Sequence, residues 1–468
     1  MPLIASVSGI RGVFGDGLDP AVIVRYAAAY GAWVRARYGG ERDGGHDGER
    51  AAAPRVVVGR DGRVTGELCL RLVTATLQAA GCDVIDGDLA STPTVAMGVL
   101  EHAAQGGVIL SASHNPAQWN ALKLLDARGE FLGPEEAAQV LTLAEHDAGA
   151  HTVSYERIGT YRRADLLPYH VAQILALPYV DAGAIAARGF RVVVDAVNSV
   201  GALALPPLLD ALGVSYEVLN GDVTGRFAHN PEPLPEHLGE VMARVRETGA
   251  DLGIVVDPDV DRLAFVENGG AFFGEERTQV AAADFLLGKR AGPVATNLSS
   301  SRLLEDVAAR HGQTVHRAPV GEIHVVRVMQ REGAVIGGEG NGGVILPDLH
   351  YGRDALVGVA LVLQHLAETG RSLAELRADW PVYHLAKHRI DLAENMEAGA
   401  LLAALASRYD GAEGARVSTA DGVKVDLPEG WVHVRASNTE PILRVYAEAA
   451  SPEAATALAE RFKAEVLA

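Results

Sequence analysis

Short runs rich in Val and Ile alternate along this chain with longer segments rich in Ala, Leu and Arg that have a helical period. The alternation is typical of parallel strands covered by helices, because each parallel strand needs a long crossover and is buried on both faces. The pattern predicts an α/β fold with mixed sheets. The clearest strands are expected at residues 55–58, 107–110, 191–195, 252–256 and 334–336, and each is followed by a polar or Gly-rich stretch.

The pattern changes near the C-terminus. Residues 431–435 and 442–448 predict paired strands, and residues 452–467 predict a helix, which together indicate a smaller α+β domain. A chain of 468 residues is too long for one ordinary hydrophobic core. Three successive strand-rich blocks of about 100 residues suggest duplicated α/β units before that last domain.

Composition excludes several classes of partner. The formal net charge of −19 argues against binding nucleic acid or an anionic membrane, although a local group of arginines can still bind a phosphate. The chain has no apolar run of the roughly 18 residues that a membrane helix needs, and residues 1–6 lack the pattern of a secretory signal. We therefore expect a cytoplasmic protein, either a monomer or a homodimer. Two cysteines without metal-type spacing indicate neither a disulfide framework nor a thiolate zinc site, and the charged, Gly-rich segment 39–50 is expected to be a loop without an assigned role.

The first candidate site motif is Ser111 to Pro116, directly after the predicted strand 107–110. A serine on such a turn is exposed to reaction, and loop N–H groups together with Lys123 could hold the anion that forms when Ser113 is phosphorylated. Lys123 could also exchange a proton with the serine oxygen. By itself, the motif fits an ordinary Ser/Asn/Pro turn equally well.

The second motif places Asp257, Asp259 and Asp261 directly after the predicted strand 252–256, with Arg262 next to them. In an extended segment, carboxylates at i, i+2 and i+4 point to one side and repel one another unless a cation lies between them. Oxygen ligands of this kind suit Mg²⁺ better than zinc, and an oxygen of phosphorylated Ser113 could complete the shell. A solvated acidic loop is the alternative interpretation.

Two further loops carry groups suited to a sugar phosphate. In the Gly-rich segment 337–343, Glu339 and Asn341 offer acceptors and donors for sugar hydroxyls, although a flexible turn would have the same composition. Segment 435–441 is followed by Arg444, and its arginine, hydroxyls and loop N–H groups could cradle a phosphate, or simply form a capped hairpin turn. Smaller motifs that support the same interpretation occur around Arg11, at residues 59–63 and at residues 317–321.

Taken together and in this order, the motifs resemble those of the α-D-phosphohexomutase superfamily across essentially the whole chain. The serine-phosphate motif of that family corresponds to residues 111–116 with Ser113 as its phosphoserine, and its metal loop, usually Asp-Gly-Asp-Gly-Asp-Arg, corresponds to residues 257–262 with Pro258 and Val260 as changed spacers. Its sugar loop corresponds to Glu339 and Asn341. Its phosphate loop, Arg-x-Ser-Asn-Thr-x-Pro, is matched without change by Arg435, Ser437, Asn438, Thr439 and Pro441.

The resemblance implies four domains around one central cleft: a phosphoserine domain (1–152), a metal domain (153–268), a sugar domain (269–375) and a C-terminal phosphate domain (376–468). It implies a mutase that interconverts hexose 1-phosphates and hexose 6-phosphates through a phosphoserine and a bisphosphorylated sugar. Mg²⁺ is the expected cofactor, and glucose 1,6-bisphosphate or the matching hexose bisphosphate is the expected activator. The implied catalytic residues are Ser113, Lys123, Arg11 and His114; the implied metal ligands are Ser113, Asp257, Asp259 and Asp261; and the implied substrate-binding residues are Arg262, Glu339, Asn341, Arg435, Ser437, Asn438, Thr439 and Arg444.

Departures from the family pattern leave some assignments open. Relatives often carry a histidine where this chain has Gly343, so His114 and His350 are the histidines that could serve in its place as a base. Glucosamine, glucose and mannose phosphates differ at C2, where one or two hydrogen bonds decide the preference, and the motifs do not rank them. Two other functions remain: a metal-dependent sugar-phosphate phosphatase or phosphotransferase with a nucleophilic aspartate in the Asp257 loop, and an inactive sugar-phosphate binding protein.

Overall fold

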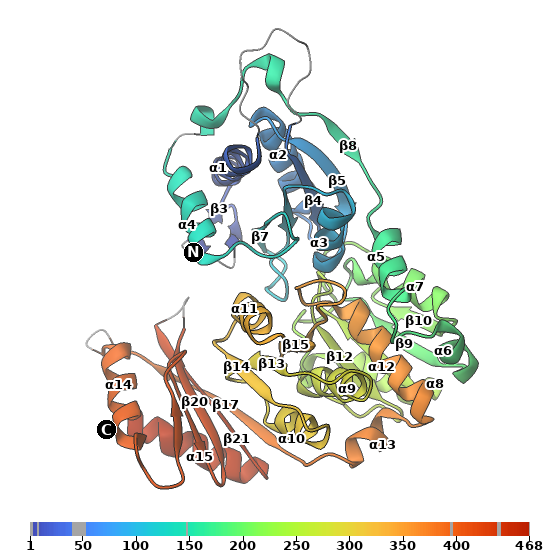
Figure 1. The fold of residues 1–468 in the computed structure, drawn as a ribbon, viewed down its shortest axis with the longest axis vertical. Coiled ribbons are helices and arrows are strands. Elements are labelled where there is room, and N and C mark those ends of the chain that lie inside the picture. The colour runs from blue at the N-terminus through green and yellow to red at the C-terminus, as the bar shows by residue number, and fades with distance from the viewer. Residues whose placement is uncertain are drawn as a thin grey trace. The chain divides into compact units, whose positions relative to one another are not determined.

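The computed structural model describes residues 3–6, 9–39, 53–146, 148–393, 396–437 and 441–467 (Figure 1). They divide into two compact units, of which the first comprises Met1–Thr278 with Gly342–Ala374 and the second comprises Gln279–Asn341 with Glu375–Ala468. Most of the segment 39–50 lies outside the described residues. The domain boundaries expected at residues 152, 268 and 375 stay predictions.

The first sheet of the first unit is mixed. Its strand order is β1-β2-β7-β6-β4-β5-β8, and β3 pairs with β2. The strands β4, β5, β6 and β8 run parallel, whereas β7 is antiparallel to both β2 and β6. The strand bounds are Ile4–Ser6 (β1), Gly9–Phe14 (β2), Gly17–Leu18 (β3), Arg55–Arg60 (β4), Asp83–Leu89 (β5), Gly106–Leu110 (β6), Trp119–Leu125 (β7) and Tyr161–Arg163 (β8).

Both faces of this sheet are covered, as the apolar composition of its parallel strands predicts. Alternate residues of β4 belong to different cores: Val56 and Val58 pack on one side with residues of α1 and α2, and Val57 packs on the other side with residues of α3. The α1 helix begins at Pro20, where the Asp19 side chain accepts a hydrogen bond from the Val22 N–H. The helices of this part are α1 (Pro20–Tyr38), α2 (Gly66–Ala79), α3 (Thr92–Glu101) and α4 (Pro134–Leu143).

The second sheet of the first unit has the strand order β10-β9-β11-β12. Its inner strands β9 (Arg191–Asp195) and β11 (Leu252–Val256) are parallel, and they begin and end at the residues that the sequence pattern predicts. Its outer strands are β10 (Ser215–Leu219) and β12 (Leu263–Glu267). The surrounding helices are α5 (Leu167–Leu175), α6 (Ala182–Arg188), α7 (Gly201–Ala211), α8 (Gly239–Thr248) and α12 (Ala355–Thr369), the last of which follows the short strand β16 (Gly343–Ile345).

The second unit contains a parallel sheet and an antiparallel sheet. The parallel strands are β13 (Val294–Asn297), β14 (Val315–Ala318) and β15 (Ile336–Glu339), accompanied by α10 (Leu303–Arg310) and α11 (Glu322–Glu332). The antiparallel sheet has the order β17-β21-β20-β19-β18, and α14 (Ala398–Tyr409) and α15 (Pro452–Leu467) pack on it. Its strands are β17 (His384–Asp391), β18 (Arg416–Ser418), β19 (Val423–Leu427), β20 (Gly430–Ala436) and β21 (Ile442–Ala449). The α/β prediction, including the α+β end of the chain, is confirmed.

One predicted strand is displaced. The sequence predicts a strand at residues 334–336, but β15 spans Ile336–Glu339, so its second half consists of residues expected in the loop. The prediction was wrong because Gly337 and Gly338 have low intrinsic strand preference, whereas the neighbouring strand β13 supplies the pairing: Ala295 lies opposite Gly337. A Cβ at Gly337 would lie 2.4 Å from Met329 Sδ, so a larger residue there would require the Met329 side chain to move.

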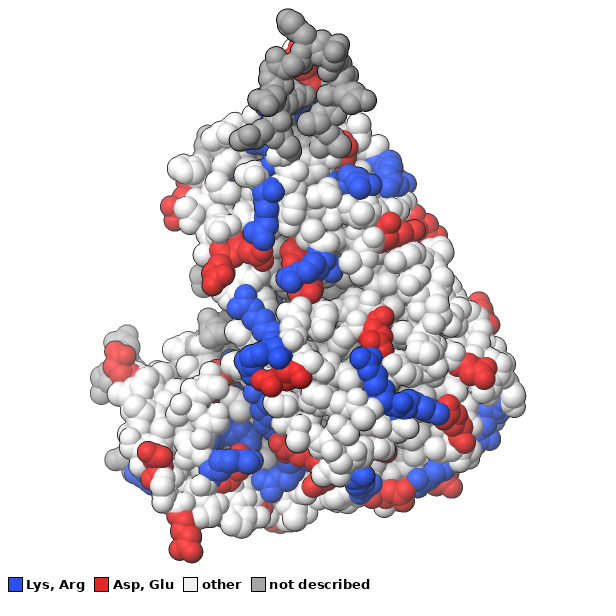
Figure 2. All heavy atoms as spheres, in the orientation of Figure 1, with Lys and Arg blue, Asp and Glu red and all other residues white. Residues whose placement is uncertain are grey.

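The surface mixes charges of both signs. On the face shown in Figure 2, many Lys and Arg side chains lie beside Asp or Glu side chains; the exposed Arg71–Glu67 pair of α2 is one ion pair of this kind. Solvent-exposed pairs contribute little to stability. Within the described residues, no helix is both long and apolar enough to cross a membrane.

Candidate active site

Ser113 lies on the turn after β6, and its backbone is held in an uncommon conformation. Its φ is +50°, in the left-handed region that non-glycine residues seldom adopt. The Ser113 N–H donates to Ser111 Oγ at 2.9 Å, and the Ser111 hydroxyl donates to Asp61 Oδ2 at 2.7 Å. The Ser113 hydroxyl donates to Asp257 Oδ2 at 2.7 Å, which brings the predicted serine and metal motifs together.

A residue without a role in the sequence-based prediction, Arg63, organises the serine turn. Its guanidinium is fully buried and donates to four backbone carbonyls of that turn, those of Ser113, Asn115, Pro116 and Trp119. Its Nε donates to Asp61 Oδ2 at 3.0 Å. All five N–H donors of the side chain are therefore used, and the turn that carries Ser113 has a fixed shape. The sequence motif at residues 59–63 marked this segment as a candidate, but it could not reveal the hydrogen-bond partners of Arg63.

The predicted metal ligands converge, but not as an extended segment. Asp257 to Asp261 form a turn in which the Val260 N–H donates to the Asp257 carbonyl at 3.1 Å and Val260 has a φ of +61°. The expected extended geometry is therefore wrong, because this backbone hydrogen bond bends the chain. One carboxylate oxygen of each aspartate nevertheless lies within 4.8 Å of the others, and all three residues are fully buried.

The three aspartates fit a hard cation such as Mg²⁺. Asp259 Oδ1 and Asp261 Oδ1 are buried and have no hydrogen-bond partner among the described residues. Their other oxygens are fixed: Asp259 Oδ2 accepts from Lys123 Nζ at 2.7 Å and from Thr92 Oγ1 at 2.6 Å, and Asp261 Oδ2 accepts from Arg353 Nη2 at 2.7 Å. Two oriented, unsatisfied carboxylate oxygens beside the Ser113 hydroxyl form an all-oxygen donor set suited to Mg²⁺.

The charges of these groups depend on one another. Burial and the neighbouring Asp261 and Asp259 raise the pKa of Asp257 well above its usual value. Burial also acts to raise the pKa of Asp259, but the Lys123 ammonium outweighs it and the net pKa is lowered. Burial lowers the pKa of Lys123, yet Asp259 and Asp261 raise it further, so the net pKa lies above the ordinary value and the ammonium keeps its charge at neutral pH.

Positive side chains gather beside Ser113. Burial, together with the neighbouring Arg262 and Arg353, lowers the pKa of Arg11, which lies on β2. Burial, and next to it the charges of the same two arginines, hold the pKa of His114 well below its usual value. His114 Nδ1 lies 3.4 Å from Ser113 Oγ. An anion relieves the repulsion within a partly buried group of like charges, so this group is suited to bind a phosphate.

The sugar-loop residues lie in the second unit. Glu339 ends β15, is buried, and accepts hydrogen bonds at Oε1 from Asn297 Nδ2 at 2.9 Å and from the Gly321 N–H at 3.0 Å. Asn341 Nδ2 lies 3.5 Å from Glu339 Oε2. Asn297 ends the neighbouring strand β13, and no sequence motif indicated its contact with Glu339.

The phosphate-loop arginines face each other across a strand pair of the second unit. Arg435 on β20 lies opposite Arg444 on β21, and Arg435 Nε donates to Asp421 Oδ2 at 3.0 Å. The same Asp421 oxygen accepts from the Val320 N–H at 3.0 Å. The Ser437 N–H donates to the Ile442 carbonyl at 3.0 Å. Asn438 and Thr439 lie outside the described residues. Directly opposed arginines repel each other, and a bound phosphate would offset that repulsion.

Four family models match successive parts of the chain. They are described as phosphoglucomutase/phosphomannomutase alpha/beta/alpha domain I (residues 3–150), domain II (residues 168–270), domain III (residues 274–383) and the C-terminal domain (residues 389–465).

Similar proteins cover nearly the full length of the chain. A phosphoglucomutase/phosphomannomutase of Thermococcus kodakarensis is 36% identical over 96% of this chain and 94% of its own length. A probable phosphoglucosamine mutase of Methanopyrus kandleri is 34% identical over 97% and 96%. A solved phosphoglucomutase/phosphomannomutase family protein of Burkholderia thailandensis has a TM-score of 0.84 at 27% identity, covering 99% of this chain and 96% of its own. A putative phosphomannomutase of Thermus thermophilus has a TM-score of 0.82 at 27% identity, and the match covers both chains completely.

Proposed function

Since the chain belongs to the phosphoglucomutase/phosphomannomutase family and is a phosphohexomutase, an intramolecular phosphotransferase, we propose that Ser113 carries the phosphoryl group. One observation supports this most directly. The Ser113 hydroxyl lies 2.7 Å from Asp257 Oδ2, beside two buried carboxylate oxygens without hydrogen-bond partners among the described residues. A nucleophilic oxygen at a cation site is the arrangement that phosphoryl transfer needs.

We propose that Asp257, Asp259 and Asp261 bind Mg²⁺ together with an oxygen of the phosphorylated serine. When bound, the ion would act as a Lewis acid that withdraws charge from the phosphoryl oxygens. Lys123 and Arg353 fix the orientation of Asp259 and Asp261 through their ion pairs at 2.7 Å. Lys123 also places a positive charge beside the transferred group, a role consistent with its raised pKa.

In the proposed cycle, the Ser113 Oγ–P bond breaks as a P–O bond forms to one hydroxyl of a hexose monophosphate. The proton of that hydroxyl passes to a base, and the released Ser113 oxygen takes up a proton. The resulting hexose bisphosphate turns over, and its other phosphoryl group returns to Ser113 Oγ. Arg11 and Arg262 would hold the phosphoryl group at the serine. His114, with Nδ1 at 3.4 Å from Ser113 Oγ, is the imidazole placed beside the reacting oxygen and is our candidate for the base.

Substrate binding is assigned to the second unit. We propose that Glu339 and Asn341 bind sugar hydroxyls, and that Arg435, Arg444 and the segment that contains Ser437, Asn438 and Thr439 bind the phosphate that is not being transferred. Charge-assisted hydrogen bonds from paired arginines are well suited to that phosphate. Hexose 1-phosphates of glucose, mannose and glucosamine are the proposed substrates, with glucose 1,6-bisphosphate or the matching bisphosphate as activator.

We also propose that the enzyme acts in the cytoplasm. Cys69 and Cys82 are both buried free thiols, as is usual for proteins of reducing compartments.

The test compares the wild type with Ser113→Ala, using Ser215→Ala as a control at an exposed serine on β10. Each protein is incubated with Mg²⁺, a trace of glucose 1,6-bisphosphate and each of the three hexose 1-phosphates, and formation of the 6-phosphate is followed. We expect Ser113→Ala to abolish mutase activity and to remove a labile phosphate seen by intact mass, with no change in the control. Full activity of Ser113→Ala would contradict the phosphoserine cycle. Release of inorganic phosphate that does not depend on Ser113 would favour a phosphatase with an aspartate nucleophile.

A further inference from the structure

A second group of metal-ligating side chains lies in the first unit, outside the aspartate site. It consists of His170 on α5, His350 in the segment before α12, and Asp354 at the start of α12. One ligand atom of each residue lies within 4.8 Å of the others, and all three residues are buried. Asp354 Oδ2 lies 2.8 Å from His170 Nε2 and 3.3 Å from His350 Nε2.

Asp354 is oriented by the helix that it caps. Its Oδ1 accepts hydrogen bonds from the Leu356 N–H at 2.8 Å and from the Val357 N–H at 3.3 Å, as an N-cap aspartate does. That leaves Oδ2 facing the two imidazoles.

His170 is held from its far side. His170 Nδ1 lies 3.0 Å from Thr94 Oγ1, which itself lies 2.6 Å from Ser91 Oγ. Because a hydroxyl can accept as well as donate, Thr94 Oγ1 can accept a hydrogen bond from Nδ1–H when a metal ion takes the place of the proton on Nε2. Metal-binding histidines are usually oriented by such a hydrogen bond from their other ring nitrogen.

His350 is incompletely satisfied. Its side chain is 3% exposed, and its nearest polar contact is the 3.3 Å approach to Asp354. His350 Nδ1 is buried and has no hydrogen-bond partner in the part of the chain that the structure describes. Protein hydrogen bonds therefore satisfy this buried imidazole poorly: only its Nε2 has a polar neighbour in the described part of the chain, at a long 3.3 Å.

We propose that His170, His350 and Asp354 form a second metal site, for Zn²⁺ or a similar borderline divalent transition-metal ion. Two imidazoles and one carboxylate are a donor set that suits zinc, whereas the three carboxylates at Asp257 suit the harder Mg²⁺. The ion would join α5 to the start of α12. It would thereby support the adjacent Arg353, whose Nη2 lies 2.7 Å from Asp261 Oδ2.

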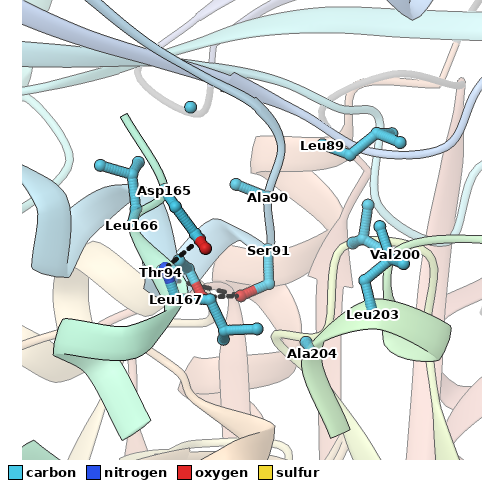
Figure 3. A pocket seen from close by; sticks show the side chains of 11 residues that line it. Leu89, Ala90, Ser91, Thr94, Asp165, Leu166, Leu167, Val200, Leu203 and Ala204 are labelled. Atoms are coloured by element: carbon cyan, nitrogen blue, oxygen red, sulfur yellow. Dashed lines mark hydrogen bonds between the residues drawn. The ribbon is translucent and has the colours of Figure 1, made fainter. Parts of the chain in front are cut away.

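A small, partly open cavity lies beside Thr94. Its volume is about 30 Å³, and Ser91 and Thr94 lie in its wall with Leu166, Leu167 and Val200. Figure 3 shows the Ser91 and Thr94 side chains turned toward each other, joined by their hydrogen bond. Thr94 Oγ1 therefore lies between this cavity and the ring of His170.

The test uses the full-length protein, freed of metal with a chelator and then titrated with Zn²⁺ in the presence of excess Mg²⁺ to fill the aspartate site. We expect one equivalent of zinc per chain by elemental analysis after gel filtration, a higher thermal midpoint, and a visible spectrum of four-coordinate Co²⁺ when cobalt replaces zinc. His350→Ala should lose this zinc, and Thr94→Val, which removes the support of His170, should weaken binding by about 10–100-fold.

His311→Ala is the matched control, because His311 Nε2 pairs with Asp284 Oδ1 at 2.7 Å in a histidine–aspartate pair outside the proposed site. This variant should keep the full equivalent of zinc. Circular dichroism shows whether each variant is folded. If His350→Ala does not fold, Thr94→Val still tests the proposal. The proposal is overturned if the wild type binds no zinc under these conditions, or if zinc binding by folded His350→Ala or Thr94→Val equals that of the wild type. A site without metal would then be a hydrogen-bonded cross-link.

Discussion

At the scale of single residues, a buried arginine fixes the turn that carries Ser113, the proposed phosphoryl carrier. Ser113 has an uncommon positive φ, and such a conformation persists when its surroundings over-determine it. Arg63 provides that constraint through its bonds to the carbonyls of Ser113, Asn115, Pro116 and Trp119. The residue that shapes the turn thus differs from the residue that we propose to react.

Replacing Arg63 by lysine should damage the serine turn. An ammonium offers three donors in place of five and lacks the planar fork, so several carbonyls would lose their partners. We expect Arg63→Lys to lower kcat by about 100-fold through misplacement of Ser113, and to lower the free energy of unfolding by about 3 kcal/mol. Mutase assays and urea unfolding measure both. Arg128→Lys, at a side chain that is 65% exposed, is the control; equal losses in the two variants would contradict a specific role for Arg63.

The unsatisfied oxygens of Asp259 and Asp261 lead to a prediction about metal. Removing Mg²⁺ with a chelator should abolish activity, and adding it back should restore activity. Asp261→Asn should raise the Mg²⁺ concentration for half-maximal activity by at least about 10-fold, because the site loses a charged oxygen. Asp126→Asn, at a buried carboxylate of another loop, should leave that concentration unchanged. An unaltered Mg²⁺ requirement in Asp261→Asn would argue against the assigned ligand set.

At the scale of elements, a partly buried ion pair joins the end of β9 to the segment between β10 and α8. His229 Nε2 lies 3.0 Å from Asp195 Oδ2, and His229 Nδ1 lies 2.7 Å from the Asn230 carbonyl. Both ring nitrogens thus face acceptors, and the protonated imidazole satisfies both. Burial lowers the pKa of His229, but the hydrogen bond and charge of Asp195 outweigh it and raise the net pKa above the usual value.

This pair predicts a pH-dependent contribution to stability. Because the pKa of His229 is higher in the folded state, its stabilisation is complete below the unfolded pKa of about 6.5 and is lost as the pH rises through the folded pKa. The wild type should exceed His229→Gln by about 1 kcal/mol in free energy of unfolding at low pH, and the difference should shrink as the pH rises. Chemical unfolding across this range measures it. In an Asp195→Asn background the pH dependence should disappear; a difference that grows with pH would contradict the assignment.

At the scale of the whole molecule, chemistry and binding are assigned to different parts of the chain. Ser113, Lys123 and the three aspartates belong to the first unit, and Glu339, Arg435 and Arg444 belong to the second. A separate phosphate-binding part can hold the non-reacting phosphate of either hexose monophosphate while the same serine performs both transfers. The proposed function therefore predicts that defects in the two units have different kinetic signatures.

Arg435→Ala tests this division of labour. Loss of a charge-assisted hydrogen bond of about 1.5–3 kcal/mol should raise KM for the hexose phosphate by about 10–100-fold. The phosphate content of Ser113 and the Mg²⁺ requirement should stay as in the wild type, since both belong to the first unit. Steady-state kinetics and intact mass measure these quantities. Arg416→Ala, at a side chain that is 81% exposed, is the control. A lost phosphoserine in Arg435→Ala would contradict the division.

Local sequence patterns predicted most of the fold. The strands β9 and β11 and the helix α15 have the predicted bounds, because runs of β-branched residues and a helical apolar period report burial that neighbouring residues share. β15 was displaced because its glycines have no local strand preference and their pairing comes from β13. The motif residues of the serine and aspartate loops were also found from sequence, since each motif directly follows a strand.

The sequence by itself therefore determined the fold class and the side chains of the aspartate and serine motifs that we propose as reactive. The tertiary structure decided how those side chains are held. Arg63 reaches carbonyls about fifty residues away in sequence, the turn at Val260 replaces the expected extended segment, and His170 meets Asp354 from a distant helix. The physical reason is that periodicity records which face of an element is buried, whereas a hydrogen bond between distant segments depends on where the whole chain places donor and acceptor.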